Sequence, residues 1–156
     1  MRFYIVFFIA ILLDQVSKIW VRLHLPTGDS LEIWTGILHF THYENSGAAS
    51  SMFQGYGRLF VPVAILAVVF VLYFRRKGHL NRWLLDVGAA LFAGGAIGNA
   101  IDRVLFNQVT DFIVFQSSNG IMNVADLVLN LAILLLGLDQ LLKYWRNRRT
   151  RYYHKI

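Results

Sequence analysis

The chain contains no cysteine among its 156 residues, and charged residues make up only 15% of it. Without cysteine it can form no disulfide, no thiolate nucleophile and no cysteine-based metal site. A soluble domain usually carries about a quarter charged residues, so the low charge argues against that class. Hydrophobic residues make up 56% of the chain and its mean hydropathy is +0.50. Together these values indicate an integral membrane protein.

Nothing in the sequence divides the chain, because it has no Pro/Gly/Ser-rich linker, low-complexity tract or internal repeat. We therefore expect a single domain over residues 1–156. Transmembrane helices need about 20 residues, and the segments that qualify are 3–21, 56–74, 83–101 and 121–142. The first has no small-residue cleavage site and is interrupted by Asp14 and Gln15, so we interpret it as a retained span rather than a signal peptide.

Basic residues are distributed unevenly along the chain. Arg2, the connection 75–82 and the tail 143–156 hold 11 of the 15 Lys and Arg residues. By the positive-inside rule both termini are expected in the cytoplasm. The net charge of +6 therefore indicates topology in a phospholipid bilayer, and no nucleic-acid partner is expected.

The segments 22–55 and 104–120 are expected on the opposite, outer side. "SLEIW" and "GILHFTHYE", joined by a Thr35-Gly36 turn, predict short strands. His39 and His42 lie three residues apart and would point to opposite faces of a strand, so we interpret them as surface or interfacial histidines. The expected fold is an all-α membrane protein with four transmembrane helices and a small β-rich extracytoplasmic cap at 22–55, between the first and second.

Acidic residues gather toward the outer half of the predicted bundle. An ionisable side chain within a membrane span costs several kcal/mol if it faces lipid, so it suggests a functional site by default. For any single acid, a helix cap or a structural ion pair is an equally good interpretation. The seven acids concerned, of nine in all, are Asp14, Asp29, Glu32, Glu44, Asp102, Asp111 and Asp126.

Helical spacing brings several of these acids onto shared faces. Asp14 and Lys18 are four residues apart, which predicts a local ion pair with Lys18 extending toward the membrane interface. In "GGAIGNAIDR" one face carries Gly95, Asn99, Asp102 and Arg103, while Gly94 and Gly98 form a small-xxx-small pair that permits close helix packing. In the last span, the polar stripe is Asn123, Asp126 and Asn130, in which Asn123 could also cap the helix.

Five motifs occur in order: "DQVSK" (14–18), "NSGAA" (45–49), "GGAIGNAIDR" (94–103), "VTDF" (109–112) and "NVAD" (123–126). On these motifs and the four spans, nearly the whole chain resembles the bacterial lipoprotein signal peptidase (signal peptidase II) family. The resemblance implies a membrane-embedded aspartic endopeptidase that cuts prolipoproteins just before a diacylglyceryl-modified cysteine. It also implies a site on the outer side of the cytoplasmic membrane, inhibition by globomycin-type peptides and no cofactor. A monomer is expected.

The resemblance also implies roles for particular residues. Asp111 and Asp126 would form the catalytic pair, because two close carboxylates share a proton and can act together as base and acid. The residues that would line or support the substrate groove are Asn45, Gly95, Asn99, Arg103 and Asn123, with Asp14 and Lys18 at its edge. The sequence departs from the family pattern at Ser50, where an aromatic residue is usual, and at Leu127, where serine is common.

Acids, asparagines and glycines within spans are also typical of small transporters and proton-conducting subunits. That alternative predicts a polar path across the bilayer, whereas these acids gather toward one side. A scaffold for lipoprotein sorting, without catalysis, is a weaker third interpretation.

Overall fold

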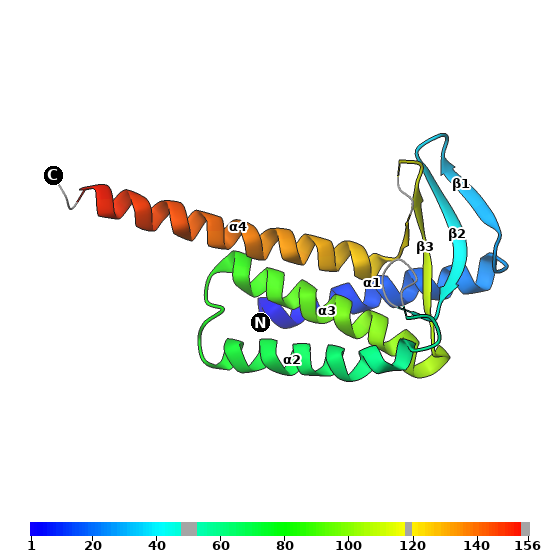
Figure 1. Cartoon of the computed structure of the whole chain (residues 1–156), viewed down its shortest axis with the longest axis horizontal. Coiled ribbons are helices and arrows are strands. Elements are labelled where there is room, and N and C mark those ends of the chain that lie inside the picture. Colours follow the sequence, from blue (N-terminus) through cyan, green and yellow to red (C-terminus); the bar gives the residue numbers. More distant parts are fainter. Residues whose placement is uncertain (48–52, 118–119, 154–156) are drawn as a thin grey trace.

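The structure, a computed structural model, describes residues 1–47, 53–117 and 120–153. Its helices are α1 (Arg2–His24), α2 (Phe60–Arg76), α3 (Trp83–Phe106) and α4 (Val124–Tyr153), and the short 3-10 helix η2 (Gly57–Leu59) leads into α2. Four helical segments have the length and hydropathy needed to cross a membrane. They run side by side with a sheet at one end, and α4 projects beyond the others at the opposite end (Figure 1). The prediction of four transmembrane helices is confirmed.

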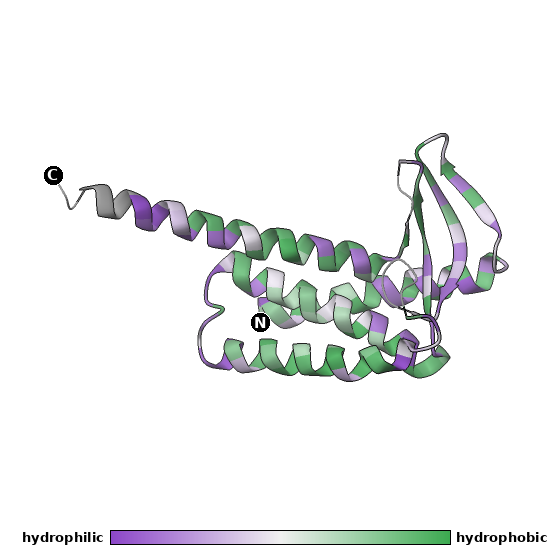
Figure 2. Cartoon of the chain, viewed as in Figure 1, coloured by the Kyte–Doolittle hydropathy of each residue, from purple (hydrophilic) through white to green (hydrophobic). Residues whose placement is uncertain are grey.

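Helix α3 is the centre of the bundle and packs against α1, α2 and α4. Its buried face is built largely from glycine and alanine, among them Ala90, Ala93, Gly94 and Gly98, which let neighbouring backbones come close. The other helices expose large apolar side chains: Phe8 of α1 is 63% exposed and Leu66 of α2 is 68% exposed. The apolar colouring along all four helices in Figure 2 fits a bundle whose outer surface contacts lipid.

Replacing Gly94 by alanine should destabilise the protein, whereas Gly137→Ala should not. A Cβ atom at Gly94 would lie 2.8 Å from Cβ of Ala10 and 3.0 Å from the carbonyl oxygen of Phe7, so α1 would have to move. We expect a loss of roughly 1–3 kcal/mol. A Cβ atom at Gly137 on α4 meets nothing within 4 Å, so alanine there should be neutral or stabilise by up to about 1 kcal/mol. Thermal unfolding in detergent measures both, and equal melting temperatures would contradict the prediction.

The sheet at the outer end contains strands from two connections. Its antiparallel order is β1-β2-β3-β4, formed by β1 (Ser30–Trp34), β2 (Leu38–Asn45), β3 (Val109–Phe115) and β4 (Ile121–Met122). The sequence predicted the first two strands, but the segment 104–120 was expected only as a loop. β3 forms there because its side chains are buried, and Phe112 and Ile113 pack against Val21 of α1.

The helix boundaries differ from the predicted spans at both ends of α4. Ile121 and Met122, expected to begin the fourth span, instead pair with Val114 and Ile113 in the sheet. Helix α4 begins at Val124 and continues through Tyr153, so most of the basic tail expected after residue 142 is helical. Lys, Arg and Leu are good helix formers, which explains the continuation. Helix α1 likewise extends to His24, beyond the predicted end at residue 21.

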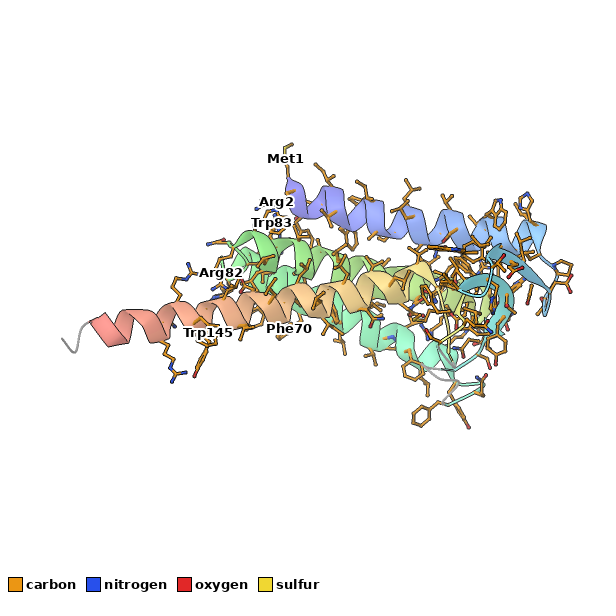
Figure 3. The ribbon with its side chains drawn as sticks, turned by 90° about the horizontal axis from the view of Figure 1, so that it is seen from above. Met1, Arg2, Phe70, Arg82, Trp83 and Trp145 are labelled. Atoms are coloured by element: carbon orange, nitrogen blue, oxygen red, sulfur yellow. The ribbon has the colours of Figure 1, made fainter. Side chains whose placement is uncertain are left out.

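Ion pairs connect the helices at the end of the bundle opposite the sheet. Asp86 of α3 lies 3.3 Å from Nε of Arg2 and also 3.3 Å from Nε of Arg75, which joins three helices. Arg82 donates to the Asp139 carboxylate of α4 at 2.8 Å. Figure 3 shows Arg2, Arg82 and Trp83 together at this end, far from the sheet. These two acids are therefore structural partners of arginine.

Candidate active site

Asp111 lies on β3, where the sheet meets the ends of the helices. Asn45 on β2 is opposite Val109, two positions from Asp111, so the two side chains are diagonal neighbours on one face. The Asn45 amide donates to Oδ2 of Asp111 at 3.0 Å. Asp111 is only 4% exposed, so this carboxyl is held in a buried polar site.

Asp126 lies in the first turn of α4 and takes part in a reciprocal helix cap. The Asp126 N–H donates to Oδ1 of Asn123 at 2.9 Å, and the Asn123 N–H donates to Oδ2 of Asp126 at 3.3 Å. This arrangement satisfies backbone donors that the helix start would otherwise leave unpaired. The predicted capping by Asn123 is confirmed.

Asn123 also connects the two aspartates. Its side-chain amide donates to Oδ1 of Asp111 at 2.6 Å while its oxygen accepts from the backbone of Asp126. A single buried asparagine, 1% exposed, therefore contacts both residues. The strand from the second connection and the start of α4 thus bring Asp111 and Asp126 into one site.

Asn99 and Arg103, one turn apart on α3, form a further wall of this site. The Asn99 amide donates to Oδ1 of Asp126 at 3.0 Å. Arg103 donates to the carbonyl oxygen of Gly47 at 3.0 Å, and its guanidinium lies 5.4 Å from the centre of the Phe60 ring. Asn99 thus contacts Asp126 directly, and Arg103 lies one turn further along α3. Their expected role in lining a substrate groove stays a prediction.

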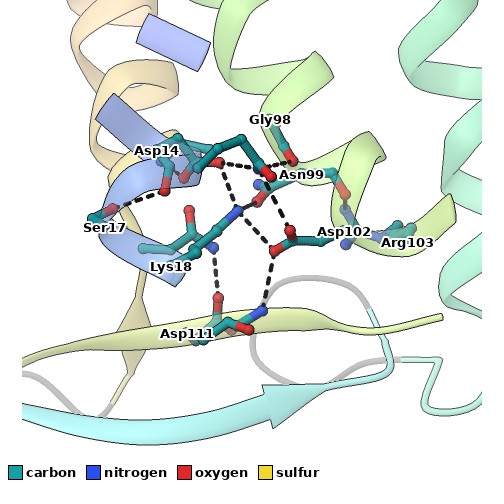
Figure 4. A network of polar contacts seen from close by, with 12 residues as sticks. Asp14, Ser17, Lys18, Gly98, Asn99, Asp102, Arg103 and Asp111 are labelled. Carbon is teal, nitrogen blue, oxygen red and sulfur yellow. Dashed lines mark hydrogen bonds and ion pairs between the residues drawn. The ribbon is translucent and has the colours of Figure 1, made fainter. Parts of the chain in front are cut away.

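Lys18 is fully buried and does not extend toward the interface, so that part of the prediction is wrong. Its ammonium group lies 2.8 Å from Asp14, 3.1 Å from Asp102 and 2.9 Å from the Asn99 oxygen (Figure 4). Arg22, 3.1 Å from Asp102, completes the cluster. The reason is charge balance: two buried carboxylates require cations within the protein.

Gly95 lies at a helix contact rather than in an open groove. A Cβ atom there would be 2.8 Å from the carbonyl oxygen of Ala125 and 2.8 Å from Leu129, both on α4. At Gly98 a Cβ atom would be 2.5 Å from Oδ2 of Asp14. These glycines support the site by letting α1 and α4 approach α3.

Sequence reasoning missed a hydrogen-bonded chain that leads from the sheet to the buried cluster. His42 contacts the Glu44 carboxylate at 2.8 Å, and the Thr110 hydroxyl donates to the same carboxylate at 2.8 Å. Arg22 in turn donates to the Thr110 hydroxyl at 2.7 Å. His42 is 5% exposed, so the expectation of a surface histidine is wrong. One feature of the sequence did indicate this cluster: Asp14, Lys18 and Arg22 follow one another at intervals of four residues, so they lie on one face of α1.

Of the two positions at which the sequence departs from the family pattern, Ser50 and Leu127, the structure describes only Leu127. Ser50 lies outside the described residues. Leu127 is 38% exposed, and its backbone N–H donates to the carbonyl oxygen of Asn123 at 3.3 Å, within the first turn of α4. A leucine at this position leaves the helix cap formed by Asn123 and Asp126 in place.

Burial raises the pKa of Asp111 to about 6, from an ordinary value of 3.8. The negative charge of Asp126 contributes to this rise in pKa, whereas the hydrogen bonds from Asn45 and Asn123 oppose it. A carboxyl whose pKa is raised by burial and a second acid is typical of sites that use carboxyls as acid and base.

Asp126→Asn should lower the pKa of Asp111, whereas Asn45→Ala should raise it. The first change removes a like charge and the second removes a hydrogen bond that favours the ionised form. Selective 13C labelling of aspartate carboxyls and NMR titration in micelles would measure both shifts. Asp29→Asn, at an exposed position, is the control and should leave the pKa unchanged. Shifts of the opposite sign would contradict the proposed proximity of the two acids.

The same pKa predicts how stability depends on pH. Between about pH 4 and pH 6 the folded protein holds a proton on Asp111 that the unfolded chain has lost, so stability falls as pH rises through this interval. The fall should be smaller in Asp126→Asn, because its Asp111 titrates closer to the ordinary value.

Among the described residues, no group of three or more His, Asp or Glu side chains is placed to hold a metal ion. The acids are instead held by amide donors and basic side chains. The expectation of no cofactor stays a prediction.

Comparisons with known proteins support the family resemblance that the five sequence motifs indicated. A family model described as Signal peptidase (SPase) II matches residues 6–142. The lipoprotein signal peptidase of Gloeobacter violaceus is 38% identical over 139 residues, covering 86% of this chain and 80% of that protein. The lipoprotein signal peptidase of Bacillus pumilus is 37% identical over 145 residues, covering 91% and 94%.

Two solved structures, each described as a bacterial membrane enzyme, share the fold. One has a TM-score of 0.86 and 30% identity and covers 94% of this chain and 90% of that chain. The other has a TM-score of 0.82 and 29% identity, with 90% and 92% covered. Since the family model spans most of the sequence and relatives are more than 30% identical over most of its length, the chain belongs to the signal peptidase II family of bacterial membrane peptidases.

Proposed function

We propose that the protein removes signal peptides from prolipoproteins, cutting before a cysteine that carries diacylglycerol, and that Asp111 and Asp126 activate the attacking water. Family membership supports the activity and the substrate class. It also favours a peptidase over the transporter alternative. The observation that carries the mechanism is the Asn123 amide, which contacts both aspartates in one buried site.

In the proposed reaction the ionised member of the pair takes a proton from water, and the resulting hydroxide attacks the scissile carbonyl. The protonated member donates to the carbonyl oxygen, and a proton then passes to the leaving amine. A raised pKa at Asp111 suits the protonated role, because the group holds its proton closer to neutral pH than an ordinary aspartate does. The pair is best described as titrating together.

The neighbouring amides would fix the direction of each carboxyl. Asn45 and Asn123 each donate to one oxygen of Asp111, and Asn99 donates to Asp126. With both acids oriented, little reorganisation is needed when charge develops on the substrate. Arg103, held at Gly47, lies at the edge where an extended peptide would enter, and it is proposed to bind the peptide backbone.

The membrane orientation is also part of the proposal. The end of the bundle that carries Arg2, Arg75 and Arg82 would face the cytoplasm, with both termini on that side. The sheet and the aspartate pair would then lie at the outer surface, where a lipid-modified cysteine is anchored. Trp83 and Trp145, near the basic end in Figure 3, suit the inner headgroup level.

A cleavage assay tests the function. The purified protein, as a monomer in detergent, should cut a prolipoprotein peptide with a diacylglyceryl cysteine, and mass spectrometry should find the modified cysteine at the new N-terminus. The same peptide with an unmodified cysteine is the matched control and should remain uncut. A globomycin-type peptide should inhibit, whereas chelators and thiol reagents should not. Cleavage of both peptides at equal rates would contradict the proposed specificity.

A further inference from the structure

A wholly apolar groove lies between α2 and α3, outside the aspartate site. Its volume is about 290 Å³, and its lining residues are Val61 and Ile65 of α2 with Ile97, Ala100, Ile101, Val104 and Leu105 of α3. Helix α2 is at the edge of the bundle in Figure 1 and packs mainly on α3. The groove is therefore open on the side of the bundle that faces lipid.

The groove lies at the same depth in the bundle as the proposed active site. Ala100 directly follows Asn99, which contacts Asp126, and Val104 directly follows Arg103. Phe60, whose ring lies beneath the Arg103 guanidinium, directly precedes Val61. On α3 the groove lining spans residues 97–105, about 12 Å of helix, and Asn99 and Arg103 of the site lie within this span.

We propose that this groove binds one acyl chain of the diacylglyceryl group on the substrate cysteine. The proposal rests on the proposed function. A chain attached to a cysteine next to the scissile bond must leave the site toward the bilayer interior, and this groove lies at the depth of the site and has no polar lining. Binding there would recognise the lipid modification directly, because burial of each methylene group favours the complex.

The groove lining supplies a matched pair of variants on α2. Ile65 lines the groove and is 51% exposed, while the next residue, Leu66, is 68% exposed and does not line it. Ile65→Trp should fill the groove, whereas Leu66→Trp adds the same side chain on the lipid-facing surface at nearly the same depth. Neither residue belongs to the proposed aspartate site.

The experiment compares KM and kcat for peptide substrates carrying dipalmitoyl or dioctanoyl glycerol, in the same mixed micelles. Ile65→Trp should raise KM for the dipalmitoyl substrate about tenfold, leave kcat unchanged, and affect the dioctanoyl substrate much less. Leu66→Trp should have the same KM and kcat as the unmodified protein for both substrates. Ile101→Ala, which widens the groove, should shift the preference toward longer chains.

Several outcomes would overturn the proposal. Equal KM values in Ile65→Trp and Leu66→Trp would show that the groove is not used. A rise in KM that is independent of chain length would assign the groove to the peptide instead. If the unmodified protein cut neither substrate, the proposed function itself would fail, so the two failures are distinguishable.

Discussion

Asp111→Asn and Asp126→Asn are each expected to reduce the rate of prolipoprotein cleavage by about 10³-fold or more, with little change in KM. Each substitution keeps the size and planarity of the side chain but removes the ability to exchange a proton. The loss should be as large in either variant as in the double variant, because the two acids act as one unit.

Asparagine is the appropriate replacement because the surroundings of both acids are polar. Asp111 accepts from two amides, and Asp126 accepts from Asn99 and from the backbone of the helix cap. An amide in either place can retain one acceptor, so the fold should survive. Circular dichroism and the thermal melting profile of each variant would establish this.

The matched control is Asp29→Asn, a change of the same chemistry at an exposed position on the sheet side of the molecule. It should cleave at the rate of the unmodified protein. Retention of full activity by either Asp111→Asn or Asp126→Asn, in folded protein, would exclude the aspartate pair as the catalytic centre.

The sequence allowed the four spans and the composition of the site to be predicted. Long apolar runs locate membrane helices, and Asn123 and Asp126 have the spacing of a helix cap. The position of Asp111 relative to Asp126 could not be predicted from periodicity. It depends on pairing between β2 and β3, which are separated by more than sixty residues and by two helices. Hydropathy also predicted the start of α4 too early. Ile121 and Met122 are apolar, but they pair with β3 in the sheet rather than begin a helix in lipid.

The orientation of Lys18 shows the same limit of local reasoning. From the sequence of α1 alone, a lysine four residues after an aspartate suits a surface ion pair. The structure directs it inward because Asp102, on a different helix, is also buried and needs a cation. Only the tertiary arrangement of α1 and α3 brings these charges together.

Lys18→Met is therefore expected to destabilise the protein by roughly 3–5 kcal/mol, the largest stability loss predicted for a single substitution here. Methionine has a similar length but leaves two fully buried carboxylates, Asp14 and Asp102, without their shared cation. It also removes the donor to Asn99, the residue that contacts Asp126. Thermal unfolding in detergent should show a clear fall in melting temperature.

A second substitution should recover part of this loss. After Lys18→Met, Asp102 still has Arg22 at 3.1 Å. Among the described residues Asp14 has no second cation within contact distance, and its remaining donors there are the Ala125 N–H at 2.8 Å and the Gln15 amide at 3.1 Å. Neutralising Asp14 in the Lys18→Met background should therefore stabilise, although Asp14→Asn alone should destabilise. The reversal of sign is the signature of charge imbalance rather than of lost packing.

Lys143→Met provides the control, because Lys143 is an exposed lysine on α4. Its removal should change stability by no more than about 0.5 kcal/mol. If Lys18→Met unfolded no more readily than Lys143→Met, the buried ion cluster would contribute little to the bundle. Asp14 and Asp102 would then be held by their hydrogen bonds and by Arg22 alone.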